Sequence, residues 1–158
     1  MKIALGADHA GFHLKEELET FLISEGHEVT DCGAASEDPT DDYPDFVRPA
    51  ALLVAQGDVD RAIVIGSSGE GEAMTANKIR GVRAVVYYGA AERLPDSHKV
   101  GHEKSIIEAS RTDNDSNVLA LGASFVSLES AKRVVTEWLS LQFSHEERHV
   151  RRIAKLEA

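Results

Sequence analysis

The stretch "GSSGEGEAM", from Gly66 to Met74, follows the apolar run "RAIVI" and combines three glycines, two serines and two carboxylates. Backbone N–H groups from Ser67 to Gly71 can surround a phosphate or a developing oxyanion, backed by the helix expected to follow. Glu72, in the first turn of that helix, would place a general base beside an oxyanion hole, as proton abstraction next to a carbonyl requires. A structural interpretation stays open, in which the glycines shape a tight turn and Glu72 complements the helix dipole.

Two common nucleotide-binding motifs are excluded at their diagnostic positions. The glycine loop lacks the Lys-Ser/Thr pair of a P-loop, and "GADHAG" after the first apolar run is not G-x-G-x-x-G. The sequence therefore argues against a nucleoside triphosphate or a dinucleotide.

Asp8 and His9 follow the first expected strand, where they could open a sugar ring or orient a hydroxyl group. Asp8 has an equally good structural interpretation as the cap of the next helix. The pairs His9/His13 and His98/His102 have the i, i+4 spacing of zinc ligands, which leaves a metal-dependent enzyme as a weaker hypothesis. Because neither pair has a clear third ligand, we expect no metal and no cofactor.

The C-terminal segment "HEERHVRRIAKL" contains the basic cluster of an otherwise acidic chain. Arg148, Arg151 and Arg152 would lie with His145 and His149 on about two turns of a helix. The cluster could be a solvated helix end, or it could clamp a phosphate, because Arg binds phosphate in a bidentate manner. It is too small for a nucleic-acid interface.

Length and charge limit the class of protein. The 158 residues suit one domain, residues 1–158, and a formal net charge of −10 disfavours nucleic acid and anionic membrane surfaces. No apolar run approaches the roughly 18 residues of a membrane span. The only cysteine, Cys32, fits a reducing compartment, so we expect a cytoplasmic protein.

Strand and helix patterns alternate along the chain. Apolar runs predict strands over 2–7, 27–33, 60–69, 82–88 and 116–123. Helical spacing predicts helices over 11–26, 71–81, 103–111, 127–143 and 144–158, and a loop that leads into a helix over 41–57. Continuously apolar strands indicate a doubly wound α/β fold with a parallel sheet covered on both faces. Ligands of such sheets bind beyond the carboxyl ends of the strands, near the point where strand order reverses. Residues 89–104 are expected to form an inserted loop.

"ALGADHAGFHLKEEL", "DDYPDF", "GSSGEGEAMTANKIRGVRAV", "DNDSNVLALGA" and "ERHVRRI", in this order, resemble the type B ribose 5-phosphate isomerase and galactose 6-phosphate isomerase family. The resemblance implies a Rossmann-like, five-stranded parallel sheet in three α/β/α layers with a C-terminal helix. It also implies a homodimer or tetramer with active sites at the subunit interface. The implied activity is metal-free aldose–ketose isomerisation of a sugar phosphate through a cis-enediolate.

The resemblance also implies a role for individual positions. Glu72 corresponds to the proton-transfer base of one branch, whereas another branch uses a cysteine at the position of Gly66, so Cys32 is not the base. The expected catalytic residues are Glu72, Ser68, Asp8 and Asp113. The expected substrate-binding residues are His9, Tyr43, Ser67, Gly69, Glu70, Gly71, Asn77, Asn114, Arg148, His149 and Arg152.

Two positions depart from the family pattern. Asp113 stands where the family usually has a ring-opening His from the partner subunit, and Ser124 stands where a phosphate-binding Arg is common. His98, Lys99, His102 or Lys104 of the insertion could replace these groups. The substrate is then a short, open-chain sugar phosphate or another pentose or hexose phosphate. The alternative is a catalytically silent sugar-phosphate binding or regulatory protein.

Overall fold

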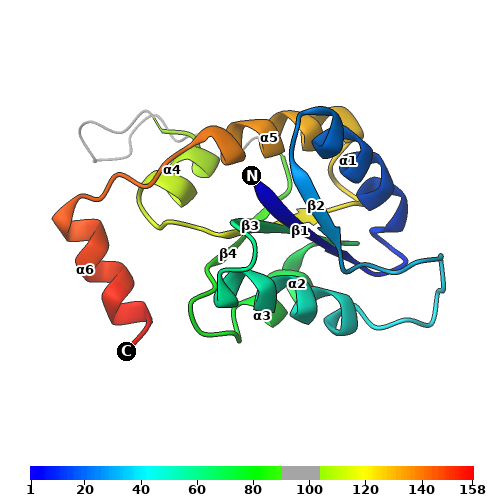
Figure 1. Cartoon of the computed structure of the whole chain (residues 1–158), viewed down its shortest axis with the longest axis horizontal. Helices are drawn as coiled ribbons and strands as arrows, with labels where there is room; N and C mark the ends of the chain where they lie inside the picture. The colour runs from blue at the N-terminus through cyan, green and yellow to red at the C-terminus, as the bar shows by residue number, and fades with distance from the viewer. Residues whose placement is uncertain (90–103) are drawn as a thin grey trace.

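Five strands form one sheet in the order β2-β1-β3-β5-β4 in a computed structural model that describes residues 1–89 and 104–158 (Figure 1). Every neighbouring pair is parallel. The strands are β1 (Lys2–Ala7), β2 (Glu28–Asp31), β3 (Arg61–Gly66), β4 (Ala84–Tyr87) and β5 (Val118–Gly122). The predicted five-stranded parallel sheet is confirmed.

Helices cover both faces of this sheet, as predicted for a doubly wound α/β fold. One face carries α1 (Phe12–Ser24), α4 (Ile106–Thr112) and α5 (Leu128–Ser140), and the other carries α2 (Pro44–Gln56) and α3 (Glu70–Ala76). The last helix, α6 (Glu147–Leu156), stands off from these layers at one side of the molecule (Figure 1). No helix of the described residues is long and apolar enough to cross a membrane.

The central strands explain why the sheet lies inside. β3 and β5 are buried at every position, and Trp138 of α5 is fully buried against the same core. Gly11 lets α1 approach β3 closely, because a Cβ at this position would overlap the carbonyl of Ile65. This approach brings the turn that follows β1 next to the end of β3.

Several predicted helix boundaries differ from the structure, and three of the differences have a clear local cause. α3 ends at Ala76 instead of near residue 81, and the next residue, Asn77, bonds through its side-chain amide to both backbone groups of Ala84. α6 begins at Glu147 because His145 has a positive φ of 55°, which is incompatible with a helix. α4 begins at Ile106, capped by Ser105, whose Oγ accepts the Glu108 N–H at 3.0 Å.

Of the expected insertion, 89–104, only Gly89 and Lys104 are described. His98, Lys99 and His102 therefore lie outside the described residues, and their predicted roles receive no structural account.

Candidate active site

The strand order reverses between β1 and β3. From β1 the chain moves outward to β2, and it then returns to β3 on the other side, so these neighbours diverge at their carboxyl ends. Ala7 pairs with Ile65, which sets Asp8 of the turn after β1 beside Gly66 of the glycine loop. The two turns expected to carry chemistry therefore meet at the predicted ligand position of this fold.

The glycine loop is held in shape by the segment after β5. Ala123 N–H donates to the Gly66 carbonyl at 2.8 Å, and Ser124 N–H donates to the Ser67 carbonyl at 3.0 Å. The hydroxyls of Ser67 and Ser124 also lie 3.0 Å apart. Gly69 has a φ of 79°, which only glycine adopts without strain. Ser124, which stands where the family often has an arginine, thus supports the loop and adds no positive charge.

The carboxylate of Glu72 lies directly over Gly66. Glu72 is only 4% exposed, and a Cβ built on Gly66 would overlap Oε1 and Cδ of Glu72. The carboxylate thus fills the space that a side chain at position 66 would need. A cysteine at position 66 and a glutamate at position 72 would therefore bring their reactive atoms to the same place.

Burial raises the pKa of Glu72, and the nearby charge of Asp8 raises it further. The backbone N–H groups of Glu72 and Gly69 act in the opposite direction, but the net shift is upward. A carboxylate with a raised pKa is a stronger base, which suits a residue that takes a proton from carbon and gives it back.

Asp8 is 6% exposed and caps the turn that leads into α1. Its Oδ1 accepts the N–H groups of Ala10 at 3.0 Å and Gly11 at 3.2 Å. Asp8 therefore holds the turn before α1, whereas the N-cap of the helix itself is Gly11, which has no side-chain cap. The second oxygen of Asp8 makes no hydrogen bond with any described residue, so the same carboxylate keeps an acceptor for a ligand.

His9 is bound by Asp41, a residue that the sequence did not single out. Nδ1 of His9 lies 2.5 Å from Oδ1 of Asp41, and both oxygens of Asp41 accept the His9 backbone N–H at 3.1 Å. Asp41 is the first residue of the family-like segment "DDYPDF", but neither that resemblance nor the acidic run "DPTDDYP" indicates a pairing with His9. His13 pairs separately with Glu37 at 3.2 Å.

In the described ranges, two groups of three side chains have their possible metal-ligand atoms within 4.8 Å of one another. They are Asp8, His9 and Asp41, and Glu16, Glu19 and Asp31. Neither group contains His13, so the two histidines of the first i, i+4 pair do not share a donor set within 1–89 and 104–158.

Tyr43, in the segment that leads into α2, packs against the glycine loop. A Cβ on Gly71 would lie 2.7 Å from Cζ of Tyr43, so the ring rests on the glycine loop. The segment begins at Asp31, whose Oδ1 accepts the Gly33 N–H at 2.8 Å and whose Oδ2 binds the buried Lys15. Glu70 is exposed at the start of α3.

The remaining predicted residues form a second group. Asp113 and Asn114 follow α4, and Lys104 Nζ donates to Asp113 Oδ1 at 2.7 Å. The ring of His149 is 2% exposed, and its Nδ1 lies 3.7 Å from the same Oδ1 and 3.0 Å from Ser144 Oγ. The start of α6 is thus anchored on the end of α4.

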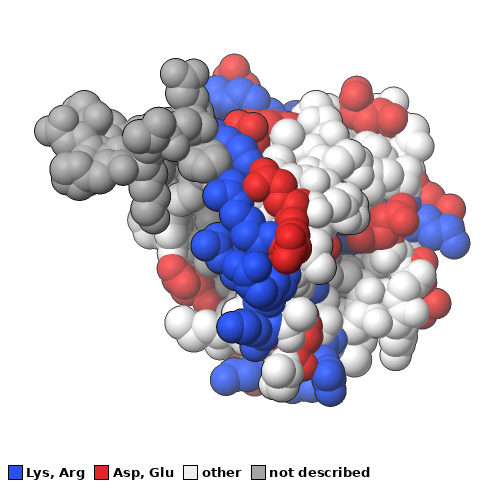
Figure 2. Space-filling model, turned by 90° about the vertical axis from the view of Figure 1, so that its left-hand side faces the viewer, with Lys and Arg blue, Asp and Glu red and all other residues white. Residues whose placement is uncertain are grey.

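The arginines of α6 stay accessible. Figure 2 shows Lys and Arg side chains gathered in a stripe on the side of the molecule that carries α6. Arg148 is partly exposed and pairs with Glu146 at 2.8 Å, and Arg152 is exposed. Near the end of the helix, Glu157 accepts hydrogen bonds from Gly81 at 3.0 Å and Arg83 at 3.3 Å.

The two groups lie at opposite edges of the sheet. Asp113 and Asn114 precede β5, whereas the glycine loop is held by residues that follow it. Five residues of strand span roughly 16 Å. The structure therefore does not bring Asp113, Asn114, Arg148, His149 or Arg152 to Glu72 within one chain.

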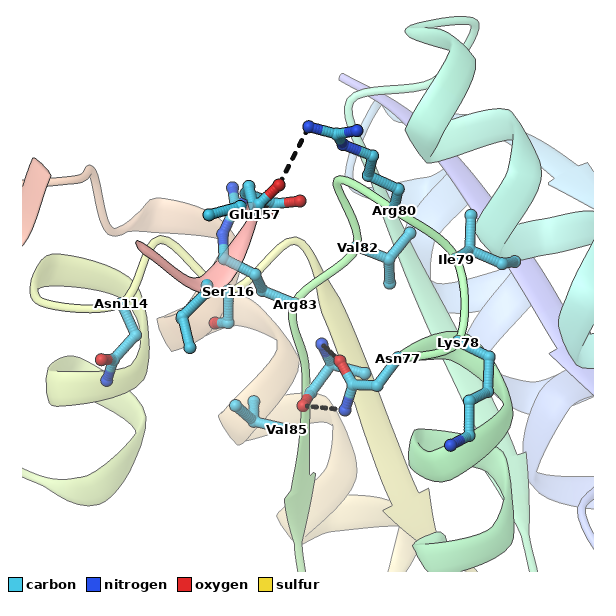
Figure 3. A pocket seen from close by; sticks show the side chains of 13 residues that line it. Asn77, Lys78, Ile79, Arg80, Val82, Arg83, Val85, Asn114, Ser116 and Glu157 are labelled. Carbon is cyan, nitrogen blue, oxygen red and sulfur yellow. Dashed lines mark hydrogen bonds and ion pairs between the residues drawn. The ribbon is translucent and has the colours of Figure 1, made fainter. Parts of the chain in front are cut away.

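A groove of about 580 Å³ lies between the end of α6 and the segment before β4 (Figure 3). Its lining includes Asn77, Val85, Asn114 and Leu156. Asn77 Nδ2 donates to the Ala84 carbonyl at 3.0 Å, and Asn77 Oδ1 accepts the Ala84 N–H at 2.8 Å. The side chain of Asn77 is thus hydrogen-bonded to the backbone at the start of the edge strand β4, away from the glycine loop.

The chain is similar to known proteins over nearly its whole length. The model of a family described as Ribose/Galactose Isomerase matches residues 3–93 and 99–156. Ribose-5-phosphate isomerase B of Escherichia coli is 41% identical over 157 residues, covering 99% of this chain and 95% of that protein. D-erythrulose-4-phosphate isomerase 2 of Mycolicibacterium smegmatis is 37% identical over 90% of this chain and 86% of that protein. A crystal structure of ribose-5-phosphate isomerase B from Mycoplasma genitalium with bound ribulose-5-phosphate has a TM-score of 0.84 and 32% identity, covering 99% and 93% of the two chains.

Proposed function

Because the chain belongs to the ribose/galactose isomerase family, we propose that it interconverts the aldose and ketose forms of a phosphorylated sugar. The observation that carries the proposal is the buried carboxylate of Glu72, held over Gly66 in a loop of backbone N–H donors. A base and an oxyanion site are thereby combined, which is what transfer of a proton between two adjacent carbons requires.

The reaction proceeds by one proton shuttle. Glu72 takes the proton from C2 of the aldose, and the C2–H electron pair forms the C1–C2 double bond while the C1 carbonyl oxygen becomes an oxyanion. The N–H groups between Ser67 and Gly71 hold this cis-enediolate, and the Ser68 hydroxyl lies next to the reacting carbons. Glu72 then returns the proton to C1 while the O2 proton moves to O1, which gives the ketose. All the groups needed come from the protein, so the proposed mechanism uses no metal.

The complete site combines two copies of the chain in a homodimer. The carboxyl edge of one protomer supplies Glu72, and the amino edge of its partner supplies the arginines of α6. The separation of these groups within one chain supports this arrangement, as does the position of α6 outside the layers of the sheet. Arg148 and Arg152, one turn apart, would bind the phosphate and leave the carbonyl end of the sugar at Glu72.

The substrate class follows from Asp113. Partial burial raises the pKa of Asp113, but hydrogen bonds from Lys104 and Thr112 outweigh this and lower it overall. An ionised carboxylate already paired with Lys104 is a poor proton donor at neutral pH, so it would not open a sugar ring. We infer an open-chain substrate such as a tetrose 4-phosphate, whose O4 is esterified and cannot close a furanose. The name of the M. smegmatis relative fits this class.

A binding or regulatory protein without turnover is the second candidate. It is favoured by Asp113 and Ser124, which stand where the family usually has a histidine and an arginine. For either function we place the protein in the cytoplasm, where sugar phosphates occur and where Cys32, partly buried and free, would stay reduced.

The decisive experiment is an isomerase assay in D₂O over tetrose, pentose and hexose phosphates. We expect turnover with deuterium incorporation next to the carbonyl, fastest for tetrose 4-phosphates, and unchanged turnover after exhaustive chelation. Glu72→Gln should lower kcat about 10³-fold and leave sugar-phosphate binding within about threefold, because a general base contributes 10² to 10⁴ in rate. Glu17→Gln, on the exposed side of α1, is the matched control.

Binding without deuterium exchange would support the regulatory protein instead. A clear preference for a ring-forming pentose would contradict the open-chain substrate while leaving the isomerase intact. Loss of turnover on chelation would overturn the metal-free mechanism.

A further inference from the structure

Asp41 lies in the loop before α2, yet it contacts His9 at both backbone and ring. The two oxygens of Asp41 each lie 3.1 Å from the His9 backbone nitrogen, and Oδ1 lies 2.5 Å from Nδ1 of the ring. The Asp41 side chain is 11% exposed, whereas that of His9 is 32% exposed. A largely buried carboxylate therefore fixes a ring that still reaches the surface of the site.

The bond to Asp41 decides which ring atom of His9 is free. Because a carboxylate accepts hydrogen bonds, Nδ1 must carry a proton, and this nitrogen is then occupied. Nε2 makes no hydrogen bond with any residue of 1–89 or 104–158. In the protonated ring Nε2 is also a donor, and it is the one available to a ligand.

The groups around His9 are mostly negative, which favours the protonated form of its ring. In the turn Asp8–Gly11 and the loop Gly66–Glu72, His9 is the only residue able to carry a positive charge. Three negative groups face it, which are Asp41, Asp8 and Asp38. The hydrogen bond that His9 donates to Asp41 raises the pKa of His9 most, burial lowers it less, and the charges of Asp8, Asp41 and Asp38 raise it further.

An enediolate forming in this loop would meet the carboxylate of Asp8 at close range. A cation beside the same loop offsets that repulsion, and it stabilises the negative charge more as the charge develops. A neutral His9 would not do so.

We propose that Asp41 is a positioning residue that keeps His9 an imidazolium and leaves its Nε2–H free to donate to an oxygen of the sugar. The contact with the sugar rests on the proposed isomerase function, whereas the pairing of Asp41 with His9 can be measured in the free protein.

The pairing is tested by NMR titration of the His9 imidazole in the isotope-labelled full-length protein. Asp41→Asn removes the charge and should lower the pKa of His9 by about one unit or more, the usual effect of losing a close opposite charge. Asp41→Glu, which keeps a carboxylate, should restore at least half of that shift. Asp42→Asn, an exposed neighbour of the same type, should leave the His9 titration unchanged. An unaltered His9 titration in Asp41→Asn would overturn the pairing.

The catalytic consequence is tested by the pH profile of kcat/KM. Activity should fall as pH rises and His9 loses its proton, and Asp41→Asn should move this alkaline limb to lower pH by the shift seen in the titration. At the pH where only the wild-type ring is charged, kcat/KM should drop about tenfold. In a His9→Gln background Asp41→Asn should cost less than twofold.

An alkaline limb that stays in place in Asp41→Asn would overturn the catalytic role, as would equal costs of Asp41→Asn in the two backgrounds. A wild-type protein that turns over no sugar phosphate would instead overturn the proposed function, and the NMR titration would still decide the pairing.

Discussion

The two edges of the sheet carry different kinds of functional groups. At the carboxyl edge, Asp8 and His9 lie in a turn fixed by hydrogen bonds, and Glu72 lies in the first turn of α3. The carboxylates of Asp8 and Glu72 are both buried. At the amino edge, Arg148 and Arg152 lie on a helix that stands off from the layers and keeps them accessible. The first edge suits chemistry at a fixed distance, and the second suits recognition of a phosphate.

One small domain can thus keep catalysis and phosphate binding on separate groups of residues. A catalytic group whose pKa must be shifted needs burial and fixed neighbours, and the carboxyl ends of the strands in a parallel sheet supply both. Guanidinium groups that bind phosphate need reach and access, which a peripheral helix supplies. A second copy of the chain could bring the two edges together without exposing the acids.

The strongest test mixes two inactive variants. Glu72→Gln disables the carboxyl edge, and the double variant Arg148→Ala/Arg152→Ala disables the amino edge, so each alone should keep below about 1% of activity. Co-expressed with different tags, the two should pair at random, and each mixed dimer would contain one intact site. Activity should therefore return to roughly a quarter of the wild-type level.

The control is the triple variant Glu72→Gln/Arg148→Ala/Arg152→Ala, expressed with both tags in the same cells. Every dimer in this sample lacks an intact site, so it should stay inactive. If the mixed sample is as inactive as its two parents, the site does not combine the edges of two chains.

A second test displaces the Glu72 carboxylate by adding a methyl group beside it, without removing any functional group. The methyl group of Gly66→Ala would displace the Glu72 carboxylate, since the two overlap. A misplacement of about 1 Å costs on the order of 100-fold in rate, so we expect kcat to fall by that factor. Because the end of a glutamate side chain can rotate away, the melting temperature should change by less than about 3 °C.

The shorter side chain of Glu72→Asp leaves room for the methyl group. In that background Gly66→Ala should cost less than about threefold. A full 100-fold loss there would mean that the methyl group acts on something other than the carboxylate.

The smallest expected effect concerns stability. The pKa of Glu72 is raised in the folded state, so the folded protein binds the proton more tightly, and stability falls as pH rises from the ordinary glutamate pKa through the folded one. Glu72→Gln should therefore stabilise the protein by roughly 1 kcal/mol at pH 7, because the two backbone N–H groups offset only part of the cost of burying the charge, and burying a polar group costs about 1 to 3 kcal/mol.

This gain should shrink below about pH 4, where the glutamate is protonated in both states. Urea unfolding at the two pH values measures it, with Glu17→Gln as the exposed control. An equal gain at both pH values would show that the effect is not due to ionisation of Glu72.

Much of the fold could be predicted because its signals are local. The continuously apolar strands, the helical spacing in "SLESAKRVVTEWLSLQF" and the glycines at strand ends correctly predict the five-stranded sheet and its flanking helices. The end of α3 was missed because Asn77 makes its bonds to Ala84, seven residues away, and no helix signal contains that contact.

The candidate site was only partly predictable. The loop from Ser67 to Glu72 is contiguous, so its chemistry is visible in the sequence. Asp41 is not visible, because its partner His9 is 32 residues away in a different turn. Asp113 was visible as a departure from the family pattern, but its pairing with Lys104 depends on the way the chain returns to α4.

The fold class, the family and the residues of the glycine loop could be read from the sequence alone, since these depend on residue type and near-neighbour spacing. Three further facts required the three-dimensional structure: Glu72 lies over Gly66, Asp41 binds His9, and the arginines of α6 lie at the opposite edge from Glu72. These facts depend on distances between segments far apart in the chain, and such distances are set by strand order and packing.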